Sequence, residues 1–128
     1  AERLESTDRI TFTGFLEEHD DVLAQMRAAS VFATPSTREG FGITAAEAMA
    51  AGCTVIGADH PDSAVGEVIG DAGFLAEPTV SAIDAVLGRV LSGEQPPTNP
   101  VERAQRFDWN QVAADAMEAY TAAATGEW

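Results

Sequence analysis

Short apolar runs alternate along the chain with stretches whose apolar residues recur every three or four positions. The short runs are rich in β-branched and aromatic residues and predict four strands, at residues 9–14, 31–34, 54–58 and 73–76. The stretches between them have the spacing of amphipathic helices. Strands that alternate with helices predict an α/β protein with a doubly wound, parallel, Rossmann-like sheet.

Capping residues and glycines mark the ends of the predicted helices. Asp20 or Asp21 is the expected N-cap of the first helix, and Gly52 is expected to end an alanine-rich helix at residues 44–51. Other boundaries are a helix at residues 63–69, ended by Gly70, and a capping box formed by Ser81 and Asp84. The sequence therefore predicts at least one helix after each of the last three strands.

The last predicted helix begins after Asp108 and is expected to fray from Thr121 onward. Residues 94–100, with three prolines, predict a connector rather than a domain boundary. The apolar stripe of the last helix consists of Trp109, Val112, Ala113, Ala116, Met117 and Tyr120. Its spacing is that of one side of an amphipathic helix.

A length of 128 residues and an apolar fraction of 45% fit one globular domain, at residues 1–128. No apolar run approaches the roughly 20 residues of a membrane-spanning helix, and no secretory signal opens the chain. We therefore expect a cytoplasmic protein without a transmembrane segment. Cys53 is expected to be a small buried residue, His19 and His60 are expected at the surface, and no metal-ligand spacing is present.

The formal net charge is −14, from 21 carboxylates against 7 arginines, and the sequence has no lysine. Such a charge repels the nucleic-acid backbone and excludes a nucleic-acid-binding role. Excess carboxylates without lysine are typical of a halophile-like, acidic proteome, where they keep a protein hydrated in a salt-rich cytoplasm. The alternative is an acidic surface for interaction.

The candidate functional residues lie in the segment EGFGITAAEAMAAG, residues 39–52. Gly40 and Gly42 flank Phe41, so we expect a tight turn with positive φ that a ligand can approach closely. The helix that follows directs free N–H groups at the turn, an arrangement typical of phosphate sites, and the Thr44 hydroxyl can add a bond. The segment therefore predicts an anion site.

Two carboxylates stand on either side of this turn. Glu47, expected in the first helical turn, can accept hydrogen bonds from two ribose hydroxyls, and Glu39 can do the same for a sugar beyond the phosphates. A structural interpretation is also open, because the helix dipole alone favours a glutamate near a helix start. In this interpretation the alanines serve only to let the helix pack closely on the sheet. Spacing alone does not separate these two interpretations.

The residues from Gly40 to Ala45 also fit the dinucleotide-binding pattern G-x-G-x-x-G/A, with Asp59 at the end of the next strand. In that pattern the first glycine follows its strand directly, whereas residues 35–39 intervene here. An NAD(P)-binding domain of an oxidoreductase is therefore the alternative to a nucleotide-sugar site.

Three segments carry a family resemblance: Pro35-Ser36, Glu39-Gly40-Phe41-Gly42, and Glu47-Ala48-Met49-Ala50-Ala51-Gly52 with the strand Thr54-Val55-Ile56. They resemble the retaining GT-B glycosyltransferases of the "glycosyl transferases group 1" family. The family signature is a glutamate, seven residues and a second glutamate. The resemblance runs from about residue 9 to residue 120 and implies a domain that binds a nucleoside diphosphate sugar.

The resemblance also implies roles for individual residues. Glu39, as the catalytic residue, would contact hydroxyls of the donor sugar, and Glu47 would hold the ribose. The diphosphate would be held by the turn and the helix start, at Gly40, Phe41, Gly42, Ile43 and Thr44. The implied reaction is hexosyl transfer to an acceptor hydroxyl with retained configuration, without a metal or a cofactor.

Members of the family also have an acceptor domain, and an Arg and a Lys that contact the diphosphate. These have no counterpart in the 128 residues. We therefore expect an incomplete donor-binding domain that is inactive alone and that pairs with a partner chain or with itself. A binding-only subunit and a non-catalytic interaction remnant are the remaining alternatives.

Overall fold

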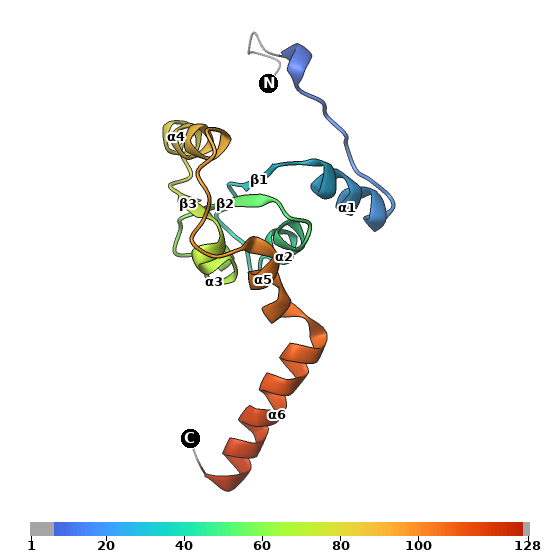
Figure 1. Ribbon diagram of the computed structural model, residues 1–128, viewed down its shortest axis with the longest axis vertical. Helices are drawn as coiled ribbons and strands as arrows, with labels where there is room; N and C mark the ends of the chain where they lie inside the picture. The colour runs from blue at the N-terminus through green and yellow to red at the C-terminus, as the bar shows by residue number, and fades with distance from the viewer. Residues whose placement is uncertain (1–6, 127–128) are drawn as a thin grey trace.

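The structure is a computed structural model that describes residues 7–126. It contains a small sheet with helices on both sides, from which one long helix projects (Figure 1). The three parallel strands, in the order β1-β2-β3, are β1 (Val31–Thr34), β2 (Thr54–Ala58) and β3 (Phe74–Ala76). The predicted parallel α/β sheet is confirmed.

Helices connect the strands, and after β3 the described chain consists of helices and short loops. In chain order they are η1 (Thr7–Arg9), α1 (His19–Ala28), α2 (Ile43–Ala50), α3 (Val65–Ile69), η2 (Gly70–Ala72), α4 (Val80–Leu91), α5 (Pro100–Ala104), η3 (Gln105–Phe107) and α6 (Trp109–Thr125). The η elements are single turns of 3-10 helix.

The central strand β2 is buried at every residue, because it is paired on both edges and covered on both faces. Its register places Thr54 opposite Val31 of β1 and Ile56 opposite Phe74 of β3.

Each face of the sheet packs against helices and forms its own apolar cluster. One face packs against α1, α2 and α3, with Met26, Met49, Val55 and Ile69 in the core. The other face packs against α4, with Ile56, Ala76, Val86 and Val90. Burial of each large apolar side chain contributes about 1.5–3 kcal/mol.

Cys53, just before β2, is buried as predicted. Its Sγ donates a hydrogen bond to the carbonyl oxygen of Met26 at 2.9 Å, which ties the end of α1 to the sheet. Burial raises the pKa of the Cys53 thiol above its ordinary value. The thiolate is therefore scarce at neutral pH, and Cys53 is a packing residue rather than a nucleophile.

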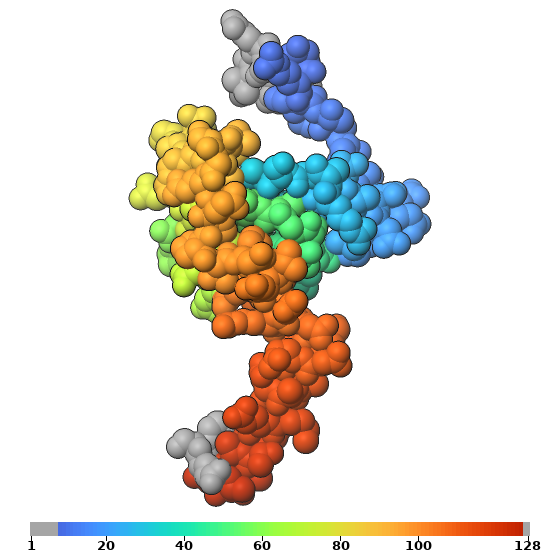
Figure 2. All heavy atoms as spheres, viewed as in Figure 1, coloured from blue at the N-terminus to red at the C-terminus, as the bar shows by residue number. Residues whose placement is uncertain are grey.

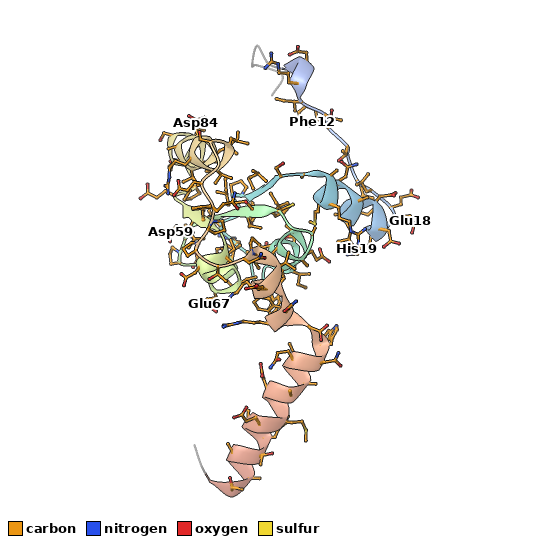
Figure 3. The ribbon with its side chains drawn as sticks, viewed as in Figure 1. Phe12, Glu18, His19, Asp59, Glu67 and Asp84 are labelled. Atoms are coloured by element: carbon orange, nitrogen blue, oxygen red, sulfur yellow. The ribbon has the colours of Figure 1, made fainter. Side chains whose placement is uncertain are left out.

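The strand predicted at residues 9–14 is wrong. Residues 10–16 run without regular secondary structure and pair with no strand that the structure describes. Phe12 and Phe15 are 73% and 90% exposed, and Phe12 lies away from the sheet in Figure 3. A strand needs a neighbour for its backbone N–H and C=O groups, and an alternating pattern alone does not supply one.

The capping box predicted at Ser81 and Asp84 is also wrong, because both residues lie inside α4. The N-cap is Thr79, whose Oγ1 accepts a hydrogen bond from the N–H of Ala82 at 3.3 Å. Thr79 and Ser81 have the same kind of hydroxyl, so composition alone could not assign the cap to one of them.

Helix α6 projects from the rest of the domain (Figures 1 and 2). Asp108 caps it as predicted, with Oδ1 accepting the N–H of Asn110 at 2.9 Å. The helix continues to Thr125, beyond the Thr121 from which the sequence predicts fraying. The predicted apolar side does not pack, and its large residues Trp109, Met117 and Tyr120 are exposed. Among the described residues, no helix has the length and apolarity needed to cross a membrane.

Candidate functional site

Two loops leave the sheet at the neighbouring carboxyl ends of β1 and β2. Residues 35–42 follow β1, and residues 59–64 follow β2. Glu39 joins the loops, because its carbonyl oxygen accepts the N–H of Ala64 at 2.9 Å and it forms an isolated parallel bridge with Ser63. The predicted turn is thus anchored at the edge where open α/β sheets bind ligands.

The turn depends on one of its two glycines for its backbone conformation. Gly42 has a φ of 83°, in the left-handed region, and is the N-cap of α2. Gly40 does not have the predicted positive φ. A Cβ placed on Gly40 would meet no described atom within 4 Å. Gly42 therefore shapes the turn, while Gly40 leaves open space beside it.

The N-terminus of α2 carries no side-chain cap from its N-cap residue. Ile43 and Thr44 are exposed in the first turn, where backbone N–H groups have no acceptor within the helix. The N–H of Gly42 donates to Oε1 of Glu39 at 3.3 Å. One of the N–H groups that the family resemblance assigned to a diphosphate thus contacts a carboxylate of the chain itself.

Glu47 lies in the second turn of α2 rather than the first, because the helix begins at Ile43. Its side chain is 24% exposed, and Oε1 lies 2.8 Å from Nε2 of His19. His19 is the first residue of α1, so the predicted caps Asp20 and Asp21 lie within the first turn. His19 is exposed as predicted, but sequence reasoning missed its contact with Glu47.

A groove of about 800 Å³ borders the exposed side of α2. The near wall is one face of α2, with Phe41 just before it. The residues of this face are Ile43, Ala46, Glu47 and Ala50. The far wall includes Val101, Phe107, Trp109 and Val112. Phe41 and Phe107 pack edge to face, with ring centroids 6.2 Å apart and planes at 83°. The groove is mainly apolar, with Glu47 as a charged group at its wall.

Arg103 of α5 holds the far wall in place. Its Nε donates to the carbonyl oxygen of Val68 at 3.0 Å, and its Nη2 donates to that of Glu67 at 2.6 Å. These carbonyls lie near the end of α3, where helical acceptors lack partners. The guanidinium carbon also lies 5.8 Å from the ring centroid of Phe107. Arg103 thus ties α5 and η3 to α3 and keeps Phe107 opposite Phe41.

Sequence reasoning missed α5 and this wall, and placed only a connector at residues 94–100. A local signal was present, because Asn followed by Pro is typical of an N-cap and the first helical residue. Oδ1 of Asn99 accepts the N–H of Val101 at 2.8 Å, and Pro100 opens the helix. With five residues, α5 is too short for periodicity to indicate it.

The geometry of the turn differs from the dinucleotide-binding pattern. Residues 35–39 separate the end of β1 from Gly40, whereas that pattern has its first glycine directly after the strand. Asp59 does follow β2 directly, and Figure 3 shows it away from His19. Within residues 7–126, no group of three His, Cys, Asp or Glu side chains is placed to hold a metal ion.

Proteins similar to this chain are glycosyltransferases. The chain is 35% identical over 123 residues to the phosphatidyl-myo-inositol mannosyltransferase of Mycobacterium leprae (strain TN), a match that covers 87% of this chain and 32% of that protein. It is 31% identical over 121 residues to the serotype-specific mannosyltransferase WbdA of Escherichia coli, covering 91% of this chain and 14% of WbdA. The chain thus spans a third or less of the length of these relatives.

A solved structure with the same fold is sucrose-phosphate synthase from Thermosynechococcus elongatus. The TM-score is 0.74 at 28% sequence identity, and the match covers 93% of this chain and 31% of that chain. The sequence profile described as "Glycosyl transferases group 1" matches residues 1–107, which include the turn and both glutamates. The chain belongs to the glycosyl transferases group 1 family and has a GT-B type of fold.

Proposed function

We propose that this chain is the donor-binding part of a glycosyltransferase that uses a nucleoside diphosphate sugar. The sugar passes to an acceptor hydroxyl with retention of the anomeric configuration. The observation that carries the proposal is the start of α2, where the N-cap residue Gly42 has no side chain to cap the helix, with Glu39 on one side and Glu47 on the other. A helix start of this kind favours an anion, and carboxylates favour hydroxyl donors.

In this proposal the diphosphate lies at the start of α2, beside the open space at Gly40. The N–H groups of Phe41, Gly42 and Ile43 hold its oxygens, and the hydroxyl of Thr44 adds a bond. The ribose lies further along the helix, at Glu47. This order follows the order of the groups in a nucleoside diphosphate sugar.

In this proposal the carboxylate of Glu39 accepts hydrogen bonds from different groups before and after the donor binds. Without donor, its carboxylate accepts the N–H of Gly42 at 3.3 Å, which is long for such a bond. A diphosphate oxygen, carrying more concentrated charge, takes over that N–H when the donor binds. The carboxylate of Glu39 is then free to accept hydrogen bonds from hydroxyls of the donor sugar, which makes it the catalytic residue of the proposal.

The chemical step breaks the bond between the anomeric carbon and the diphosphate oxygen. A bond from the anomeric carbon to the acceptor oxygen forms on the same face, and the acceptor hydroxyl passes its proton to the departing diphosphate oxygen. Negative charge builds up on the departing diphosphate. The fixed N–H groups at the start of α2 stabilise that charge, because they point at it before the reaction begins.

Replacement of Glu47 by alanine is expected to weaken binding of a nucleoside diphosphate by about 1.5–3 kcal/mol, the range for hydrogen bonds to charged groups. This equals a loss of about tenfold to a hundredfold in affinity. The variant should stay folded, because Glu47 is not part of the apolar core. NMR titration with GDP, UDP and ADP to millimolar concentration measures the change.

The matched control is Glu118→Ala, on the exposed part of α6. It removes the same charge from the chain without touching the turn, and it should bind nucleotide as the unaltered chain does. Equal affinities of the Glu47 variant and the unaltered chain would remove the ribose role. A stronger response of residues 40–44 to NAD than to the three nucleotides would favour the oxidoreductase alternative.

The 128-residue chain by itself is expected to bind donors weakly and to transfer no sugar. The family resemblance places two cations at the diphosphate, and the sequence contains no lysine. Loss of a cation from a buried, hydrogen-bonded charge pair costs about 2–5 kcal/mol. Arg38 is near the turn, but it is exposed. An assay of the purified chain with a panel of nucleotide sugars and acceptors checks this, and product from any pair would contradict it.

A further inference from the structure

The carboxylate of Glu47 is contacted by a side chain from another helix. Nε2 of His19, at the start of α1, lies 2.8 Å from Oε1 of Glu47. The two residues are 28 positions apart in the sequence, so their contact depends on how α1 packs beside α2. Figure 3 shows His19 at the N-terminal end of α1. Oε2 of Glu47 has no hydrogen-bond partner among the described residues.

The position of α1 does not depend on this contact. Met26, in the last turns of α1, is buried in the same cluster as Ala45 and Met49 of α2. The carbonyl oxygen of Met26 also accepts the bond from Cys53. The side chain of His19 is 62% exposed, so it contributes little to the core. Core packing thus sets the helix, and the helix brings His19 to Glu47.

We propose that His19 is a positioning residue for Glu47, a role that rests on the proposed function of Glu47 as the ribose ligand. The Nε2–H group of His19 donates to Oε1 and fixes the direction of the carboxylate. A glutamate on a helix surface otherwise samples several rotamers, and ordering it on binding weakens affinity. His19 orders the carboxylate before the nucleotide arrives.

The contact leaves Glu47 able to bind both ribose hydroxyls. Each carboxylate oxygen has two lone pairs, so Oε1 keeps one acceptor position beside the bond from His19. Oε2 keeps both of its positions. The ribose therefore does not have to displace His19, and the imidazole and the nucleotide bind the carboxylate together. If the ribose had to displace His19, removal of His19 would tighten nucleotide binding. The direction of the change in affinity therefore separates the two cases.

The test compares the affinity of the unaltered chain, His19→Leu and His19→Gln for GDP, UDP and ADP by NMR titration. Leucine removes the donor, and we expect affinity to fall about two- to tenfold, the effect of ordering one flexible side chain. Glutamine carries an amide N–H near the position of Nε2 and should restore most of the affinity. If His19 only filled space, the leucine and glutamine variants would bind nucleotide with similar affinity.

The same substitutions in the Glu47→Ala chain complete the cycle. His19→Leu should have no further effect there, because the group that it orients is missing. Unchanged or tighter binding by His19→Leu in the unaltered chain, or an equal loss with and without Glu47, would overturn the positioning role and leave the ribose role of Glu47 intact. Failure of Glu47→Ala to weaken nucleotide binding would overturn the proposed function, and this role with it.

A measurement without nucleotide tests the pair itself. Glu47→Gln should shift the imidazole resonances of His19 and leave those of His60 in place. His60 is a suitable reference, because its Nδ1 accepts the N–H of Asp62 at 3.2 Å in the loop after β2. Unchanged His19 resonances would show that the pair does not form in solution and would also overturn the proposal.

Discussion

Replacement of Gly73 by alanine is expected to destabilise the domain by about 3 kcal/mol, the upper end of the range for an overpacked core. A Cβ at this position would lie 2.6 Å from Cγ2 of Ile69 and 2.7 Å from the carbonyl oxygen of Val55. Val55 lies in the central strand, which cannot shift without disturbing its pairing on both edges. A loss of this size is a large part of the 5–15 kcal/mol typical of a domain. Urea denaturation measures it.

Gly88→Ala is the matched control for this substitution. Gly88 lies inside α4, and a Cβ there would meet no described atom within 4 Å. Alanine is the better helix former, so the free energy of unfolding should rise by about 0.5–1 kcal/mol. Similar midpoints for the two variants would show that the close contacts around Gly73 relax without cost.

Replacement of Met49 by alanine is expected to lower the free energy of unfolding by about 2–5 kcal/mol, as for other large-to-small changes in cores. Met49 is fully buried and joins α2 to the cluster on the sheet. The cavity left behind would lie beneath the helix that carries Glu47, so nucleotide binding should weaken as the helix loosens. Denaturant unfolding with and without saturating nucleotide separates the two effects.

Met117→Ala tests the same side chain in the opposite environment. Met117 lies on α6 and is 66% exposed. Surface substitutions of this kind usually change stability by less than about 0.5 kcal/mol. A loss as large as that of Met49→Ala would contradict both the cavity argument and the exposed position of α6.

The elements that could be predicted from the sequence are those bounded by local signals. β1 and β2 begin and end where predicted, because their apolar runs are short and Pro35 and Asp59 follow them directly. The helix after β1 ends at Ala50, one residue before the predicted end, and Gly52 has the left-handed φ, 90°, of the predicted stop. These signals act within a few residues, so no tertiary information was needed.

The features that could not be predicted join distant parts of the chain. Residues 9–14 have a strand pattern, but a strand also requires a partner, which local sequence does not indicate. The turn and both glutamates were found from their spacing and the family resemblance. The contact of His19 with Glu47 and that of Phe107 with Phe41 were not, because each joins two elements that are far apart in the sequence.

The exposed apolar side of α6 implies that the domain has two levels of stability. A helix of 17 residues is close to the length at which isolated helices are marginal in water. Opening most of α6 uncovers no further core, so its amide protons can exchange with solvent through local fluctuations. Those of β2, buried at every residue, exchange only when the domain unfolds as a whole. The N–H of Ala64, which donates to the carbonyl oxygen of Glu39, joins the turn to the loop after β2, so this amide is expected to exchange more slowly than the amides of α6.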